Sequence, residues 1–276
     1  MLIGRREFDC DKRCYIVGIL NVTPDSFSDG GKWNTLDDAI RHTEDMIRDG
    51  VDIIDIGGES TRPGHTVISE QEEIDRTIPV VEALHRRFDI PLSIDTYKSF
   101  IAEEALRTGA DLVNDIWGLK RDSGMADVIA RAGVPCCLMH NRKQIDYIDF
   151  QSDMINDLIE SVEIAKGAGI AGNRIILDPG IGFAKTYEMN LQAINGLDKI
   201  RDLGYPALLG VSRKSVIGTA LGLPETERLE GSLAAVVIGM IRGCAFVRVH
   251  DVRETKLTVT MAEAILGRDI AVKSKV

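Results

Sequence analysis

The chain has 276 residues and a formal net charge of −10, with Lys+Arg 33 against Asp+Glu 43 and a pI of about 5.1. This acidic balance excludes a nucleic-acid binder that works through bulk charge, because such a domain carries a basic face. Hydrophobic residues make up 44% of the chain and charged residues 28%, as in an ordinary globular protein. The most apolar segment, Leu233 to Ile241, is too short to cross a membrane, and the charged N-terminus predicts no secretory signal.

Cysteine usage limits the redox compartment and the metal chemistry. The five cysteines have no CxxC spacing, which disfavours a tetrahedral metal site built on them. Cys136 and Cys137 lie inside an apolar run, where we interpret them as small buried hydrophobic residues. We therefore expect reduced thiols and a cytoplasmic protein without membrane or nucleic-acid partners.

Eight short apolar runs recur along the chain, and a glycine suited to a helix C-cap precedes most of them. Their apolar residues are continuous rather than alternating, which predicts strands that are buried on both faces, as in parallel sheets. The predicted strands, in chain order, are residues 15–20, 51–56, 91–94, 110–113, 134–139, 174–177, 206–211 and 245–249.

Stretches with helical spacing lie between these strands. Ser69 and Glu72 form the pattern of a capping box, and the helix that it opens carries Ile74, Ile78 and Val81. The positions that recur at helical spacing elsewhere include Leu36, Ile40, Thr43 and Ile47 in one stretch and Met154, Leu158, Val162 and Ala165 in another.

Strand and helix alternate through the whole chain, which implies right-handed βαβ units and a parallel sheet. Eight such units in 276 residues match a closed (β/α)8 TIM barrel that forms a single domain. The alternative is an open doubly wound sheet, which usually has fewer strands. We divide the chain into an N-terminal leader at 1–13, the barrel at 14–268 and a frayed C-terminal tail at 269–276.

The active site of such a barrel lies at the C-terminal ends of its strands. Asp95, Asn114 and Asp178 end buried strands, where a carboxylate needs a donor such as the paired N–H groups of a flat heterocycle. The alternative is that polar residues at strand ends only begin loops and cap the next helices. The residues at these ends are Asn21, Gly57, Gly58, Glu59, Asp95, Asn114, Met139, His140, Asp178, Ser212, Lys214, Arg248 and His250.

Cations and oxygen ligands at the same ends predict an anionic substrate group. Arg62, Lys214, Arg248 and His250 favour phosphate, because guanidinium and ammonium groups match its oxygens. The loops at 21–31 and 57–64 combine glycine, proline and polar residues, which is typical of segments that close over a substrate and also of plain surface loops. Neither has the Walker A form.

The first of these loops also offers hard oxygen ligands. Asn21 and Asp25 suit Mg²⁺ beside a phosphate better than they suit zinc.

Between Leu20 and Val252 the chain carries, in this order, the motifs LNVTPDSFSDGG, DIGGESTRPG, SIDTYK, VNDI, LDPGIGFAK, GVSRKS and RVHDV. Together these motifs resemble those of the dihydropteroate synthases of the folate pathway. The resemblance implies a (β/α)8 barrel that condenses 6-hydroxymethyl-7,8-dihydropterin diphosphate with p-aminobenzoate to give 7,8-dihydropteroate and diphosphate. It also implies that sulfonamides compete for the p-aminobenzoate site and that the enzyme is a homodimer.

The resemblance assigns roles to individual residues. It implies that Asp178 accepts the paired N–H donors of the pterin, and that Asn21 binds Mg²⁺ beside the diphosphate. The residues implied to bind the pterin diphosphate are Thr61, Asp95, Asn114, Met139, Asp178, Lys214, Arg248 and His250, with Arg248 packed over the pterin face. Those implied to bind p-aminobenzoate are Phe27, Pro63, Phe183, Lys214 and Ser215.

No Cys–His or Ser–His pairing for a covalent nucleophile is evident, so catalysis is expected to be electrostatic. We take Asp29, Arg62 and Lys214 as catalytic. Arg62 and Lys214, together with Mg²⁺, Arg248 and His250, stabilise the departing diphosphate, and Asp29 stabilises the pterin-methyl cation. Two alternatives remain open, a pterin-binding corrinoid-linked methyltransferase and a catalytically silent binding barrel. The first would not need the loop at 21–31 or the TRP and SRKS segments, and the intact loops disfavour the second.

Overall fold

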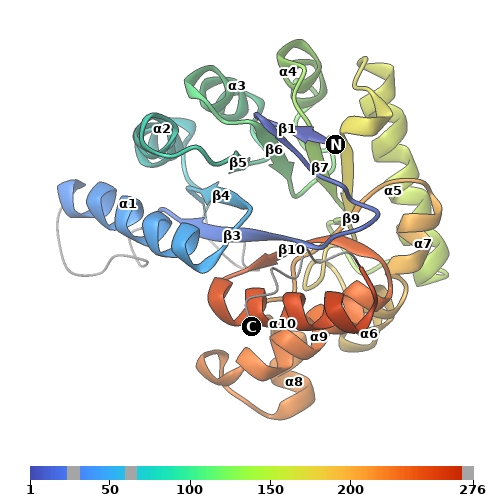
Figure 1. Ribbon diagram of the computed structural model, residues 1–276. Helices are drawn as coiled ribbons and strands as arrows, with labels where there is room; N and C mark the ends of the chain where they lie inside the picture. The colour runs from blue at the N-terminus through green and yellow to red at the C-terminus, as the bar shows by residue number, and fades with distance from the viewer. Residues whose placement is uncertain (24–31, 60–66, 269–276) are drawn as a thin grey trace.

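The computed structural model describes residues 1–23, 32–59 and 67–268. Eight parallel strands close into a barrel in which β10 pairs with β3, so the open sheet is excluded and the (β/α)8 barrel is confirmed (Figure 1). All eight predicted strands are present: β3 (Tyr15–Asn21), β4 (Ile53–Gly57), β5 (Leu92–Asp95), β6 (Leu112–Asp115), β7 (Cys136–Met139), β8 (Ile175–Asp178), β9 (Ala207–Leu209) and β10 (Cys244–Val249).

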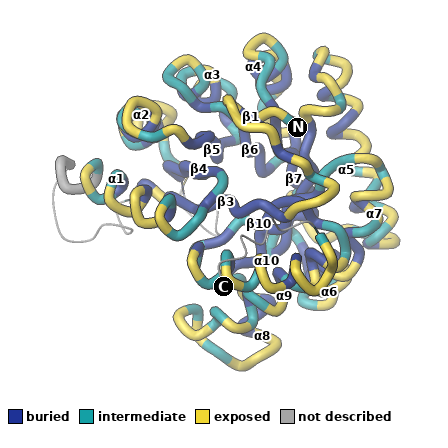
Figure 2. Tube along the Cα trace, viewed as in Figure 1, coloured by how far each residue is buried: buried dark blue, intermediate teal, exposed yellow. Residues whose placement is uncertain are grey.

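Helices form a ring outside the barrel and turn one face inward. Figure 2 shows buried strands at the centre and helices whose exposed faces point outward, as the continuous and amphipathic patterns predict. The helices are α1 (Lys32–Asp49), α2 (Glu70–Arg87), α3 (Ser99–Thr108), α4 (Met125–Ala132), α5 (Phe150–Gly167), α6 (Tyr187–Asn195), α7 (Leu197–Asp202), α8 (Ser215–Leu221), α9 (Leu229–Ile241) and α10 (Val252–Ile265), with short 3-10 turns at Gly172–Arg174 and Glu225–Glu227.

The N-cap predicted for α2 is present. Ser69 accepts a hydrogen bond from the backbone N–H of Glu72 at 3.2 Å, which satisfies one of the free donors of the first turn. The carboxylate of Glu72 pairs with Arg76 one turn later. The Ser69 cap is therefore confirmed, and Glu72 contributes an ion pair along the helix surface.

A short N-terminal hairpin covers the end of the barrel opposite the strand C-termini (Figure 1). Its strands β1 (Leu2–Ile3) and β2 (Arg6–Glu7) are antiparallel. The side chains of Ile3 and Phe8 are buried, and the Phe8 ring lies 4.7 Å from that of Tyr15 at the start of β3. The segment predicted as a leader thus completes the apolar interior of the barrel. The predicted division at residue 13 stays a prediction, and the tail at 269–276 lies outside the described residues.

The cysteines are unpaired, and most of them lie in the core. All five cysteines are free, and Cys136 and Cys137 are fully buried as predicted. In the part of the chain that the structure describes, every helix is too short or too polar to cross a membrane.

Candidate active site

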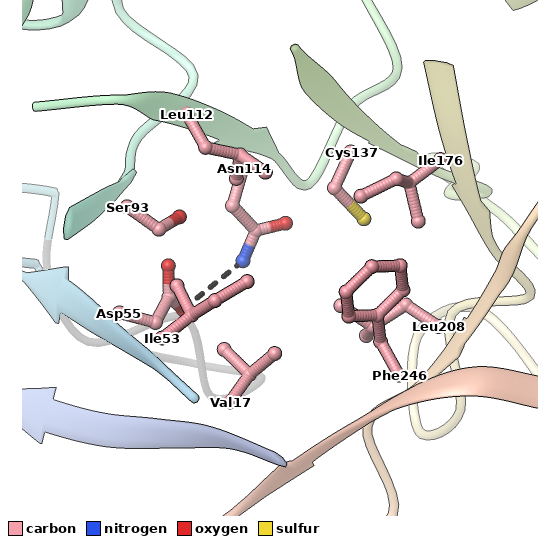
Figure 3. Close-up of a pocket in the computed structure, with 10 residues that line it drawn as sticks. All are labelled: Val17, Ile53, Asp55, Ser93, Leu112, Asn114, Cys137, Ile176, Leu208 and Phe246. Carbon is pink, nitrogen blue, oxygen red and sulfur yellow. Dashed lines mark hydrogen bonds between the residues drawn. The ribbon is translucent and has the colours of Figure 1, made fainter. Parts of the chain in front are cut away.

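Alternation along the strands places polar groups above an apolar barrel floor. Side chains two positions apart on a strand point to the same side, so Asn114 follows Leu112 into the interior, and Asp178 follows Ile176. A small cavity of about 10 Å³ lies at this level, roughly the space of one water molecule. Its walls are formed by Val17, Ile53, Asp55, Ser93, Leu112, Asn114, Cys137, Ile176, Leu208 and Phe246 (Figure 3).

Two carboxylates share one guanidinium at the centre of the mouth. Arg248 Nε donates to Asp55 Oδ2 at 2.6 Å, and an Nη2 hydrogen of Arg248 bonds Asp95 Oδ2 at 2.7 Å. Asn114 Nδ2 also donates to Asp55 Oδ2, at 3.2 Å (Figure 3). The structure thus brings Asp95, Asn114 and Arg248 together as predicted. The positive charge of Arg248 is paired with the carboxylates of Asp55 and Asp95.

Asp55 is a site residue that sequence reasoning missed. It lies inside the apolar run of β4 rather than after it, and its side chain is 1% exposed. The sequence does carry a signal for it, because a carboxylate inside an apolar strand is buried and needs a hydrogen-bonding partner. It also lies two residues before Gly57, so alternation turns it toward the barrel mouth.

Several buried oxygen atoms in this cluster have unused hydrogen-bonding capacity. Within the described residues, Asp55 Oδ1, Asp95 Oδ1 and Ser93 Oγ are buried and have no hydrogen-bond partner. Burial raises the pKa of Asp95 to about 7, the charge of Arg248 opposes this rise, and the charge of Asp55 adds to it. The two carboxylate oxygens accept hydrogen bonds when ionised, so the cluster suits a ligand that brings N–H donors.

Asp178 and Lys214 form the opposite side of the mouth. Asp178 Oδ1 accepts from the backbone N–H of Gly180 at 2.6 Å. Burial raises the pKa of Asp178 and lowers that of Lys214 to about 8, and in each case the charge of the other residue opposes the shift. A Cβ added to Gly210 would lie 3.6 Å from Asp178 Oδ2 and 3.8 Å from Lys214 Nζ, so this glycine keeps the space between them open.

Lys214 also joins Asp178 to a predicted p-aminobenzoate residue. Its ammonium donates to the backbone carbonyl of Ile181 and lies 4.9 Å from the centroid of the Phe183 ring. That distance allows a cation–π contact. Ser215 begins α8 directly after Lys214 and is exposed at the surface.

The remaining described site residues lie at the rim. The hydroxyl of Ser212 is 3.0 Å from Nδ1 of His250, and it accepts from the backbone N–H of His250 at 3.2 Å. The hydroxyl has two lone pairs and one proton, so the direction of its hydrogen bond with Nδ1 depends on the tautomer of His250. Met139 ends β7 and is buried.

Asn21 is the predicted Mg²⁺ ligand, and its surroundings fit that role in part. It is exposed at the end of β3, and a Cβ on Gly57 would lie 3.7 Å from its Oδ1 and 3.6 Å from Asp95 Oδ2. The described residues contain no group of three or more His, Cys, Asp or Glu side chains that could hold a metal. A single amide oxygen still fits Mg²⁺, which keeps several waters and binds through one or two protein oxygens and substrate phosphates.

Five other predicted site residues, and Asp25 beside them, fall in segments that the structure does not describe. They are Phe27, Asp29, Thr61, Arg62 and Pro63.

A buried ion cluster joins the two flanks of segment 60–66. Lys98 Nζ donates to Glu59 Oε2 and Glu73 Oε2, each at 2.7 Å, and to the backbone carbonyl of Ile68 at 2.9 Å. Tyr97 donates its hydroxyl proton to Glu59 Oε1 at 2.9 Å. Glu59, which the strand-end pattern included among the ligand-facing residues, therefore belongs to a structural ion pair.

His140, which had no predicted role, is buried directly after β7. Its Nε2 lies 3.0 Å from Asp157 Oδ2 on α5, and its Nδ1 lies 2.8 Å from Lys185 Nζ. Burial lowers the pKa of His140 from 6.5 to about 4, with the charge of Lys185 adding to the shift and Asp157 opposing it. The folded chain therefore keeps this imidazole neutral at neutral pH.

That shift predicts a loss of stability in acid. Between pH 6.5 and 4 the unfolded chain binds a proton at His140 and the folded chain does not, so the contribution of His140 is present above pH 6.5 and disappears toward pH 4. The shift corresponds to about 3 kcal/mol. Urea unfolding measures this effect as the free energy of unfolding of the wild type minus that of His140→Asn. This difference is expected to be about 3 kcal/mol smaller at pH 4.5 than at pH 7.5.

The comparison with His140→Asn isolates this group. Asp95, whose pKa is raised, changes the free energy of unfolding with pH in the opposite direction over the same pH range. It is present in both proteins, so its effect cancels in the comparison. A stability difference that stays constant from pH 7.5 to 4.5 would contradict the prediction.

The chain is similar to known proteins that bind pterins or act on them. A model of the pterin binding enzyme family matches residues 17–250. The dihydropteroate synthase of Clostridium beijerinckii is 56% identical over 269 residues, which are 97% of this chain and 100% of that protein.

Solved structures of dihydropteroate synthases are similar over nearly the whole chain. A dihydropteroate synthase from Clostridium difficile in the presence of pteroic acid has a TM-score of 0.93 at 50% identity, covering 95% of this chain and 100% of that one. Xanthomonas albilineans dihydropteroate synthase with 4-aminobenzoic acid has a TM-score of 0.89 at 40% identity, covering 92% of this chain and 93% of that one. The family match, the identity and the shared barrel together place this chain in the dihydropteroate synthase family of pterin-binding enzymes.

Proposed function

We propose that this chain, a transferase of the dihydropteroate synthase family, joins p-aminobenzoate to 6-hydroxymethyl-7,8-dihydropterin diphosphate. The products are 7,8-dihydropteroate and diphosphate. The observation that carries the proposal is the set of buried carboxylates at the mouth, Asp55, Asp95 and Asp178, in a barrel whose relatives have been solved in the presence of pteroic acid and with 4-aminobenzoic acid.

The pterin ring lies across the mouth in this proposal. Asp178 accepts its paired N–H donors, and Lys214 donates to the acceptor side of the ring. Asn114 and Asp95 meet another edge, where Asp95 Oδ1 has a free acceptor position. Arg248, held by Asp55 and Asp95, presents the flat side of its guanidinium to the ring. Met139 lines the pocket from below.

p-Aminobenzoate lies nearer the rim. Phe183 and Lys214 form one wall, supported by the 4.9 Å distance between the Lys214 ammonium and the centroid of the Phe183 ring, and Ser215 follows at the start of α8. Phe27 and Pro63, in the two loops of the sequence motifs, complete the pocket in the proposal.

The reaction breaks the bond between the pterin methylene carbon and the diphosphate oxygen, and the electron pair leaves with diphosphate. The amine nitrogen of p-aminobenzoate then bonds the methylene carbon and releases one proton. Arg62, Lys214 and His250 bind the departing anion, Thr61 contacts it, and Asp29 stabilises the cation. Asn21 Oδ1 would hold Mg²⁺ beside the diphosphate, and the ion would supply further neutralisation of that negative charge.

Asp29 and Arg62, from the sequence loops at 21–31 and 57–64, provide a separate test of this mechanism. Replacing Asp29 or Arg62 by alanine is expected to lower turnover about 100-fold or more, because each removes a charge that acts on the transition state. The dissociation constant of the pterin diphosphate, measured by calorimetry, should change little, since the ring binds deeper in the barrel. Turnover at the wild-type level in either variant would show that the loops do not act in this way.

Diphosphate release coupled to dihydropteroate formation tests the activity itself. Purified protein is supplied with the pterin diphosphate, p-aminobenzoate and Mg²⁺, and both products are measured. Formation in equal amounts is expected. A methyltransferase would release no diphosphate, and a silent barrel would bind the pterin without turnover.

We also propose a homodimer in the cytoplasm. Leu257, Met261 and Ile265 recur one turn apart on the outer face of α10 and are all more than half exposed, and Ile238 and Ile241 are exposed on neighbouring α9. An apolar stripe of this kind suits an interface between two copies. Light scattering behind size exclusion measures the mass directly. The free thiols support the proposed compartment.

A further inference from the structure

The loop between β8 and α6 connects three proposed site residues. The backbone N–H of Gly180 binds Asp178 Oδ1 at 2.6 Å, and the carbonyl of Ile181 accepts from Lys214 Nζ. Phe183 in the same loop lies 4.9 Å from that ammonium. A displacement of this loop would therefore change the pocket proposed for p-aminobenzoate before it changed the strand that carries Asp178.

The backbone of this loop takes positive φ at three residues, and only Ala184 among them is not a glycine. Gly180 and Gly182 have φ of +70° and +84°, and Ala184 has φ of 43°, a region that non-glycine residues seldom occupy. A Cβ on Gly180 would lie 2.0 Å from the carbonyl oxygen of His140, so the loop packs directly on the residue after β7. A conformation of this kind persists only where surrounding groups hold it.

Lys185 provides these contacts from inside the loop. Its side chain is buried, and its ammonium donates to the carbonyls of Gly180 at 2.9 Å and Phe183 at 3.0 Å. The third partner is Nδ1 of His140 at 2.8 Å. Burial lowers the pKa of Lys185 to about 7, and the charge of Asp178 opposes this shift. In its ammonium form Lys185 has three hydrogens, one for each of these three partners.

The network continues into helix α5. Asp157 Oδ2 lies 3.0 Å from His140 Nε2 and accepts from Arg142 Nε at 2.6 Å. Since the carboxylate can only accept, Nε2 carries the proton and Nδ1 offers its lone pair to Lys185. Burial keeps His140 neutral by lowering its pKa to about 4. The position of the loop is thus tied to a helix of the outer ring.

We propose that Lys185, supported by His140 and Asp157, is a positioning residue for the p-aminobenzoate end of the site. It acts through the backbone of Gly180 and Phe183, and it keeps the Phe183 ring and the Ile181 carbonyl in contact with Lys214. The inference rests on the function proposed above. It gives His140 and Lys185 a role that the motifs of the sequence do not supply.

The test is a pair of methionine variants examined by steady-state kinetics. Lys185→Met keeps the length of the side chain and removes its three donors. We expect the KM for p-aminobenzoate to rise about 10-fold or more, because small displacements of a positioned group have effects of this size. The KM for the pterin diphosphate is expected to change less than about 3-fold, since its carboxylates lie on strands. The control is Lys166→Met on the exposed side of α5, which should leave both values unchanged.

His140→Asn provides the second measurement. Its amide oxygen can still accept from Lys185, but the link to Asp157 is lost, so a smaller rise in the KM for p-aminobenzoate, about 3-fold, is expected. Circular dichroism of each variant checks folding, and if Lys185→Met fails to fold, His140→Asn decides. An unchanged KM for p-aminobenzoate in folded variants, or an equal rise in both KM values, overturns the positioning role. A wild-type protein that forms no dihydropteroate overturns the proposed function instead.

Discussion

Replacing Asp178 by asparagine is expected to lower kcat/KM for the pterin diphosphate about 1000-fold or more, because a buried acceptor pair becomes an amide that presents N–H groups to N–H donors. Asp178 is 5% exposed, and Gly210 lies between its carboxylate and the ammonium of Lys214. The change conserves shape, so folding is retained and the effect falls on ligand binding. Calorimetric titration with the pterin diphosphate measures it independently of turnover.

Asp127→Asn is a matched control for this variant. Asp127 lies exposed on α4, so the same chemical change there should leave kcat/KM unchanged. If Asp178→Asn bound the pterin diphosphate as tightly as the wild type, Asp178 would not be the residue that accepts the ring donors. The pterin would then have to bind through Asp95 and Asn114 alone.

Replacing Arg248 by methionine is expected to reduce the free energy of unfolding by about 3–5 kcal/mol, because it leaves two buried carboxylates without their cation. Asp55 is 1% exposed and Asp95 is 5% exposed, and both bond the same guanidinium. Urea unfolding at pH 7.5 measures the loss. The loss should become smaller as the pH falls, since protonation removes the uncompensated charges.

A double variant identifies the cause of this effect. Arg248→Met combined with Asp55→Asn removes one of the two uncompensated charges, so it should unfold at a higher urea concentration than Arg248→Met alone. Arg86→Met, which breaks an exposed pair with Glu82, is the control and should have little effect. Equal midpoints for Arg248→Met and the wild type would show that the carboxylates do not depend on this guanidinium.

Much of the fold could be predicted because its signals are local. Continuous apolar runs such as 174–177 and 206–211 form the strands, since a strand buried on both faces has no reason to alternate. The barrel rule then places Asp95 and Asp178 at one mouth, where the structure has them. The family motifs added the substrates, which no periodicity specifies.

Other features depend on contacts between distant parts of the chain. Arg248 and Asp55 are separated by 193 residues, and they meet only because β10 closes on β3. Asp55 itself is hidden inside an apolar run, where sequence position alone did not mark it as a site residue. The burial of Ile3 in the barrel likewise requires the closed interior to exist.

The sequence by itself determined the strand order, the single barrel and the polar residues at the C-terminal ends of the strands. It could do so because hydrophobic periodicity and chain direction are local properties. Only the tertiary structure decided which charges neutralise one another and which remain for a ligand. Lys185 meets His140 across 45 residues and Lys214 meets Ile181 across 33. Such pairings follow from the order of the strands in the sheet, because β7 pairs with β8 and β8 with β9, which brings the loops after them within hydrogen-bonding distance.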